Sequence, residues 1–193
     1  MKEIIYKPLD EIVFSSIDVE TTGLEPSSSR ICEVACLKFQ GGMIIENFAT
    51  LINPEIPIPA KVAKIHHITD EMVNDKPKFS DVAVRLLSML EKSVVVAHNA
   101  PFDISFLKME FERIGFNLPK MIVIDTLEIA RRFGNFSNNK LGTVAKHLSI
   151  STGDWHRALN DVVMAKEILE HFMMIFKKDG IVTLKDMISR IKG

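Results

Sequence analysis

The stretch that decides the fold is FSSIDVETTGL, from Phe14 to Leu24. An apolar run leads into an acidic pair, Asp18 and Glu20, and a Thr-Thr-Gly turn follows. The run from Ile12 to Asp18 predicts a β-strand, on which residues two apart point to the same face. The two carboxylates should therefore lie side by side and repel each other, unless a divalent cation with oxygen ligands sits between them. For an isolated Asp-x-Glu, a polar strand end that enters a turn is the simpler interpretation.

Composition predicts a globular protein with an ordinary core. The chain has 193 residues, of which 47% are hydrophobic and 25% are charged, which favours one domain over 1–193 with its core at about 11–178. The net charge is −1 and the pI is about 6.6. Proteins that grip duplex DNA along its backbone are usually strongly basic. Any contact with nucleic acid should therefore be short, local and assisted by bound metal.

The cysteines and the N-terminus indicate the compartment. Cys32 and Cys36 would lie about 13 Å apart on one extended strand, too far for a disulfide, so we expect two reduced core thiols. The first residues, MKEIIYKPLDEIVF, contain no long apolar signal region, and no stretch approaches a membrane span. We expect a cytoplasmic protein without membrane association.

The order of strands and helices predicts an α/β fold. Gly41-Gly42 indicates a hairpin between strands at 31–39 and 43–52, so the chain should open as a three-stranded antiparallel meander. Buried strands are then expected at 94–97 and 121–124. Helices are expected at 80–91 with Ser80 as N-cap, 101–114 with Asn99 as cap, 141–148, 157–178 and, at the C-terminus, 183–191. This alternation predicts a mixed sheet covered by helices.

Three further polar residues fall at the ends of predicted elements. Asp103 lies in the first turn of a helix, where the helix dipole alone would favour it. Asp161 lies on an otherwise apolar segment of the longest helix, so it needs a partner, a metal or water. His156 can reach the same site only from the loop or first turn ahead of that helix, and a lone His is more often a packing residue. Asp125 is most simply a helix cap and is left out of the site.

Their ordered combination resembles a known family. The motifs are D-x-E-T-T-G-L at 18–24, H-N-A-x-F-D at 98–103 and H-R-A-x-x-D at 156–161. They resemble the three motifs of the DEDDh 3′–5′ exonucleases, which include the epsilon proofreading subunit of bacterial DNA polymerase III and the exonuclease domain of the Gram-positive replicative polymerase. The resemblance runs from about Val13 to Phe176. His66-His67-Ile68-Thr69 is similar to the family's H-G-I-T element, with His67 in place of Gly.

The resemblance implies a ribonuclease-H-like fold and two divalent ions, Mg²⁺ or Mn²⁺. Asp18 would bridge both ions, Glu20 and Asp161 would hold the ion on the nucleophile side, and Asp103 would support the second ion. His156 would take the proton from the attacking water. These roles agree with phosphodiester hydrolysis, in which two cations activate the water and stabilise the charged transition state, and in which a His suits a general base.

The resemblance also implies a site for the terminal nucleotide. Thr21, Gly23 and Leu24 would contact the 3′ nucleoside, partly through the backbone. The second motif and the H-x-I-T element would complete the pocket with residues that line it, stack on a base or lie near the terminal sugar: His98, Asn99, Phe102 and His66. A pocket of this kind would admit only an unpaired end.

We therefore expect a metal-dependent 3′–5′ exonuclease acting on single-stranded or frayed DNA, in proofreading or repair. A 3′–5′ exoribonuclease stays open, because nothing in the sequence distinguishes deoxyribose from ribose. A non-catalytic nucleic-acid-binding module is the third alternative, and the intact set of four carboxylates and a His argues against it. Gln40 is the only Gln, which weakens a clamp-tethered role but leaves a DNA polymerase subunit as a partner.

Overall fold

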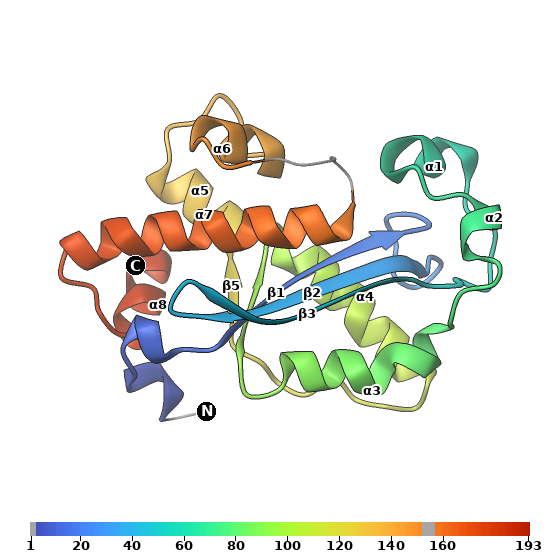
Figure 1. Cartoon of the computed structure of the whole chain (residues 1–193), viewed down its shortest axis with the longest axis horizontal. Coiled ribbons are helices and arrows are strands. Elements are labelled where there is room, and N and C mark those ends of the chain that lie inside the picture. The colour runs from blue at the N-terminus through green and yellow to red at the C-terminus, as the bar shows by residue number, and fades with distance from the viewer. Residues whose placement is uncertain (1–2, 152–156) are drawn as a thin grey trace.

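The computed structural model describes residues 3–151 and 157–193 (Figure 1). Its sheet has five strands in the order β3-β2-β1-β4-β5. The antiparallel part is formed by β1 (Phe14–Thr21), β2 (Ile31–Gln40) and β3 (Met43–Leu51). The parallel part adds β4 (Val94–Ala97) beside β1 and β5 (Val123–Asp125) beside β4. The predicted mixed sheet, in which an antiparallel meander continues into parallel strands, is confirmed.

The β2–β3 hairpin turns at the two predicted glycines. Gly41 and Gly42 have φ of 55° and 84°, and this pair of left-handed residues matches the twist of a tight hairpin. Cys32 and Cys36 are free and buried on β2, as expected. The β1–β2 register places Asp18 opposite Ala35 and Glu20 opposite Glu33.

Helices cover both faces of the sheet. Figure 1 shows α7 crossing one face together with α5 and α6, while α3 and α4 cover the other. The bounds are α1 Ala60–His66, α2 Asp70–Val73, α3 Phe79–Leu90, α4 Ala100–Arg113, α5 Thr126–Phe133, α6 Leu141–His147, α7 Ala158–Lys178 and α8 Leu184–Lys192. Two short 3-10 helices, Ile4–Tyr6 and Leu9–Glu11, precede β1. Within the described ranges, no helix is both long and apolar enough to cross a membrane.

One helix start differs from the prediction, and a second agrees in its N-cap residue but not in how that residue is held. The N-cap of α3 is Lys78, whose backbone N–H donates to Asp81 at 2.9 Å, so the expected cap at Ser80 is wrong. The N-cap of α4 is Asn99, as expected, but its side chain makes no capping hydrogen bond. Asn99 instead has a left-handed backbone with φ 81°, and its N–H donates to Asp125 at 3.0 Å. Asp125 of β5 thus holds the N-cap residue, in place of a capping hydrogen bond from the Asn99 side chain.

The alternation of side chains along the strands divides the core into two layers. Phe14 packs in the layer under α7, whereas Ile17 and Val19 pack in the layer over α3 and α4. Ser15 belongs to the second side as well, since its hydroxyl donates to the carbonyl of Met89 in α3 at 2.7 Å. Because residues two apart on a strand share a face, Asp18, which is four residues beyond Phe14, faces α7 at the end of β1.

Candidate active site

Three carboxylates meet where β1 ends beside the beginning of α7. Asp18 and Glu20 come from β1, and Asp161 comes from the first turn of α7. One oxygen from each lies within 4.8 Å of the others, and all three side chains are half-buried. The structure therefore brings together acids that are more than 140 residues apart in the sequence, and their hard oxygen atoms suit a divalent cation.

Asp103 reaches the same strand from the opposite layer. It lies in the first turn of α4, is 3% exposed, and accepts a hydrogen bond from the backbone N–H of Val19 at 3.1 Å. Burial raises its pKa to about 8, although the Val19 hydrogen bond opposes that shift. The carboxylate is thus held beside the residue that separates Asp18 from Glu20.

The electrostatics of this acidic cluster, Asp18, Glu20 and Asp161, are unfavourable without added positive charge. Burial, followed by the charges of Asp103, Asp161 and Glu20, raises the pKa of Asp18 well above its ordinary value. Burial also raises the pKa of Glu20 to about 8 and that of Asp161 to about 6. Raised pKa values of this kind are common where acidic groups are grouped at a functional site. A bound cation would remove the repulsion, so the donor set fits a metal.

Glu33 is a part of this region that the motifs did not predict. It is 4% exposed and accepts hydrogen bonds from Arg157 Nε at 3.1 Å and Nη2 at 2.9 Å. Its second oxygen accepts the N–H of Ala158 at 3.2 Å. A lone Glu inside the otherwise apolar run ICEVACL, residues 31–37, was the sequence signal that could have found it, because a buried charge needs a partner.

A hollow of about 610 Å³ opens beside the cluster, between the turn after β1 and α1. It is lined by residues that the sequence assigned to the terminal nucleotide, namely Thr21, Gly23, Leu24, His66 and Phe102, together with Glu20, Thr22, Pro59, Lys61, Val62 and Ile65. The lining is mainly apolar at the rim, where Leu24 is 81% and Ile65 is 57% exposed. Two exposed aliphatic side chains facing one hollow suit a flat apolar group such as a base.

The turn after β1 is fixed by its own hydrogen bonds. The Thr21 hydroxyl donates to the Gly23 carbonyl at 2.6 Å, and the Thr22 hydroxyl accepts the Arg30 N–H at 3.0 Å. A Cβ at position 23 would lie 2.5 Å from the Ser29 hydroxyl oxygen, so a side chain there would displace that group. The Thr-Thr-Gly sequence therefore gives a tight wall to the hollow.

His66, the last residue of α1, lines the same hollow. It is buried, and its Nδ1 accepts the backbone N–H of Ile68 at 3.0 Å. His67 follows with φ 60° and ψ 20°, a left-handed conformation in which Gly is favoured and His is tolerated. The His that replaces Gly in this element therefore keeps the turn.

His98 and Asn99 lie elsewhere. The His98 ring nitrogens are 2.9 Å from the Thr126 hydroxyl and 2.8 Å from the Asn139 carbonyl, and burial lowers its pKa. Both residues line a separate hollow, with Arg131 and Lys140 among its other residues. The structure thus does not bring them to the hollow that Thr21 and Phe102 share. His156 lies outside the described residues.

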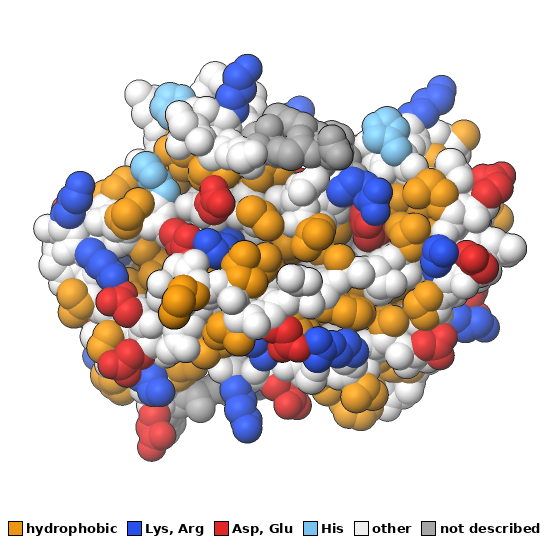
Figure 2. Space-filling view, viewed as in Figure 1, with side chains coloured by type: hydrophobic (Ala, Val, Ile, Leu, Met, Phe, Trp, Pro, Cys, Tyr) orange, Lys and Arg blue, Asp and Glu red, His pale blue; other side chains and the backbone are white. Residues whose placement is uncertain are grey.

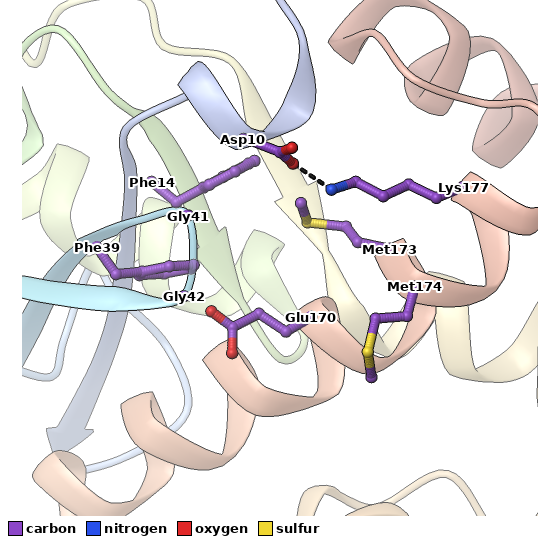
Figure 3. A pocket seen from close by; sticks show the side chains of 9 residues that line it. All are labelled: Asp10, Phe14, Phe39, Gly41, Gly42, Glu170, Met173, Met174 and Lys177. Atoms are coloured by element: carbon purple, nitrogen blue, oxygen red, sulfur yellow. Dashed lines mark hydrogen bonds and ion pairs between the residues drawn. The ribbon is translucent and has the colours of Figure 1, made fainter.

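A further hollow, of about 430 Å³, lies at the opposite end of α7 (Figure 3). Its two carboxylates are both paired, Asp10 with Lys177 and Glu170 with Lys166. Its walls include Phe14, Phe39, Met173 and Met174. Paired acids and core side chains indicate packing at this end, in contrast to the acidic cluster.

The face of the protein that carries α7 is electrically mixed (Figure 2). Figure 2 shows acidic, basic and hydrophobic side chains interspersed over the face that carries α7, rather than one broad basic surface. This agrees with the net charge of −1. Binding of a polyanion would therefore depend on local contacts at the site.

Comparison with known proteins agrees with this geometry. The family model described as Exonuclease (RNase T) matches residues 15–169, which include Asp18, Glu20, Asp103 and Asp161. The chain belongs to the RNase T exonuclease family. This confirms the resemblance seen in the motifs.

Curated relatives of the exonuclease are much longer proteins. This chain is 36% identical over 163 residues to a protein named DNA polymerase III PolC-type from Clostridium perfringens. The match covers 84% of this chain and 11% of that protein. The protein of the same name from Thermotoga maritima is 35% identical over 178 residues, covering 92% and 13%. The chain thus spans a small part of the length of the curated relatives that it matches.

Solved structures share the fold of the exonuclease. Exonuclease X, in complex with 5′ overhanging duplex DNA, is 29% identical, with a TM-score of 0.68 and coverage of 84% of this chain and 92% of that chain. Escherichia coli Exonuclease I, in complex with a dT13 oligonucleotide, is 18% identical, with a TM-score of 0.77 and coverage of 89% and 43%. These matches confirm the ribonuclease-H-like fold.

Proposed function

We propose that the exonuclease removes nucleotides from the 3′ end of single-stranded or frayed DNA, in proofreading or repair, with two divalent ions, Mg²⁺ or Mn²⁺. The observation that carries this proposal is the acidic cluster, whose three oxygens lie within 4.8 Å of one another. The choice of DNA is supported by relatives named DNA polymerase III PolC-type and by structural relatives described in complex with DNA.

The carboxylates would hold the cations. Asp18, Glu20 and Asp161 offer the converging oxygens, and Asp103 would support them from α4. Bound divalent ions supply positive charge at the scissile phosphate and lower the pKa of a bound water. His156, the residue proposed to accept a proton from that water, precedes α7 in the chain.

The hollow beside the cluster would hold the last nucleoside. The turn at Thr21–Leu24 would contact it through backbone groups, His66 would lie near its sugar, and Phe102 would stack on its base. Stacking on an aromatic ring is tolerant of base identity, which suits removal of any terminal nucleotide. His98 and Asn99 would act from outside this hollow, by holding β4 and α5 in place. Association with a DNA polymerase is proposed on the names of the relatives.

A degradation assay tests the proposal. Purified protein is incubated with Mg²⁺ or Mn²⁺ and with 5′-labelled single strands of DNA and of RNA in parallel. We expect the label to move down a ladder as DNA is shortened from its 3′ end, with no shortening in chelator or with Asp18→Ala. A surface variant, Glu46→Gln, is the matched control and should keep full activity. Faster shortening of RNA than of DNA would make the protein an exoribonuclease, and intact strands would refute the catalytic function.

A further inference from the structure

The beginning of α7 is held by a carboxylate from another element. The N-cap residue Arg157 makes no side-chain capping hydrogen bond, and the first helical N–H, that of Ala158, is instead bound by Glu33 of β2 at 3.2 Å. Glu33 also accepts two hydrogen bonds from the Arg157 guanidinium. A carboxylate at a helix N-terminus satisfies an unpaired N–H and opposes the positive end of the helix dipole.

The same carboxylate is tied to the strand that supplies the acidic cluster. In the β1–β2 ladder, Glu33 is the direct partner of Glu20. On the helix side, Asp161 follows one turn after Arg157, and its N–H donates to the Arg157 carbonyl at 3.2 Å. Because one turn of helix is rigid, fixing Arg157 and Ala158 also fixes Asp161. Glu33 therefore links the two elements whose acids must meet.

We propose that Glu33 is a positioning residue, which sets Asp161 against Asp18 and Glu20 by anchoring the start of α7 through Arg157 and Ala158. Its consequence for turnover rests on the proposed nuclease function. The anchoring itself is a statement about geometry and metal affinity. Groups that orient the ligands of a metal commonly change affinity or activity by about 10- to 100-fold when altered.

The position of Glu33 is unfavourable for a residue that serves only to stabilise the fold, because its carboxylate lies close to other acidic groups. Its negative charge raises the pKa of Glu20 and of Asp161, so it adds to the repulsion in the cluster. Its link to α7 gives a physical reason for a carboxylate at this position. A residue that only strengthened the fold would act equally well away from the cluster.

The chain offers a matched control for this distinction. Glu110 is 1% exposed and, like Glu33, accepts two hydrogen bonds from one arginine, Arg30, at 2.7 and 3.1 Å. It also accepts a backbone N–H, that of Ile31, at 3.3 Å. Glu110 thus pairs with an arginine and a backbone N–H as Glu33 does, and with a second arginine, Arg113, at 3.0 Å, while none of its hydrogen bonds among the described residues reaches α7.

The experiment compares Glu33→Gln, Arg157→Gln, the double variant and Glu110→Gln, each at a temperature where it is folded. Three quantities are measured: kcat and KM on single-stranded DNA, Mn²⁺ affinity by calorimetry, and exchange of the Ala158 amide hydrogen. For Glu33→Gln we expect kcat and Mn²⁺ affinity each to fall roughly 10-fold or more, KM to stay within about twofold, and the Ala158 amide to exchange faster. The double variant should lose no more than the worse single variant. Glu110→Gln should keep kcat and Mn²⁺ affinity.

Equal losses in Glu33→Gln and Glu110→Gln would overturn the proposal, since they would indicate a general loss of stability. Unchanged Mn²⁺ affinity in Glu33→Gln would overturn it too. If the wild-type protein fails to shorten DNA, the proposed function fails, yet Mn²⁺ affinity and amide exchange still decide whether Glu33 positions Asp161.

Discussion

Two groups of charged residues lie near the ends of the central strands, and the chain treats their carboxylates in opposite ways. One group is the buried Glu110 with its arginines, and the other is the half-buried acidic cluster. Glu110 receives hydrogen bonds from Arg30 at 2.7 and 3.1 Å and from Arg113 at 3.0 Å. In the acidic cluster, Asp18 and Glu20 face each other and Asp161, and the pKa of each is raised by burial and by like charge. The first group is compensated by the chain itself, and the second would be compensated by a bound cation.

The difference separates a structural ion cluster from a site. Burying an unpaired charge costs several kcal/mol. A chain that holds several acids together therefore loses stability, and such a loss is typical of a functional site. For Glu110, the hydrogen bonds from Arg30 and Arg113 remove that cost. The acidic cluster keeps it until a divalent ion binds, which makes ion binding favourable.

The largest effect is expected from neutralising Asp18. Asp18→Asn should lower nuclease turnover roughly 10³-fold or more. The substitution removes a carboxylate ligand of the metal ions, whose positive charge would stabilise the transition state. It should at the same time leave the metal-free protein as stable as the wild type or more so, since it removes repulsion. Turnover on labelled DNA and urea unfolding in chelator measure the two effects. A large loss of metal-free stability would show that Asp18 is compensated as Glu110 is.

His156 tests whether the chemistry extends beyond the carboxylates. We expect His156→Ala to lower turnover by roughly 10²-fold or more, the usual contribution of a general base, while Mn²⁺ affinity stays near the wild-type value. Single-turnover kinetics and calorimetry measure these quantities. Lost Mn²⁺ affinity would instead make His156 a ligand and enlarge the acidic cluster by one residue.

The sequence predicted the parts of the fold that depend on local patterns. The Gly41-Gly42 hairpin, the buried β4 and the long α7 follow from turn chemistry and periodicity. The acidic residues were identified from short local motifs, each of which lies near the beginning or the end of a strand or helix. What was missed depends on partners far away in the chain. Glu33 and Arg157 are 124 positions apart, and Glu110 and Arg30 are 80 apart, so no local pattern pairs them.

His98 also has partners that lie far away in the chain. Its motif position is beside Asp103, yet its ring is turned to the Thr126 hydroxyl and to the backbone carbonyl of Asn139. A backbone carbonyl carries no sequence signature. The direction of a side chain at the end of a strand is therefore set by packing that the motif does not encode.

Breaking the compensated group should act on stability and spare activity. Glu110→Gln leaves Arg30 with only its longer contact to Glu55, at 3.5 Å, and removes the carboxylate that Arg113 contacts at 3.0 Å. Removal of one partner of a buried ion pair commonly costs about 3 kcal/mol. The free energy of unfolding in urea measures this loss, and nuclease turnover at low temperature should stay within about twofold of wild type. A variant that is inactive although folded would contradict the division between the two groups.

The pH dependence of stability should differ with and without metal. Burial raises the pKa of Glu20 from 4.5 to about 8, so the folded state holds a proton that the unfolded state has released between these pH values. Stability of the metal-free protein should therefore fall as pH rises through this window, lowering the melting temperature by roughly 10 °C in a chain of this size. Melting curves from pH 5 to 8 in chelator and in Mn²⁺ measure it. With Mn²⁺ the fall should disappear, and a melting temperature that rises with pH in chelator would show that the cluster is already compensated.

The smallest effect should come from a carboxylate–arginine pair in water. Glu46 on β3 and Arg85 on α3 form an ion pair with side chains that are 36% and 48% exposed. Because solvent replaces either partner, Glu46→Gln should cost about 0.5 kcal/mol or less, and the loss should shrink further in 1 M salt. Urea unfolding of this variant beside Glu110→Gln compares an exposed glutamate that meets one arginine with a buried glutamate that meets two arginines and a backbone N–H. Equal losses would show that burial does not set the cost of breaking a carboxylate–arginine contact. They would thereby remove the argument from burial that the acidic cluster is held together at the expense of stability.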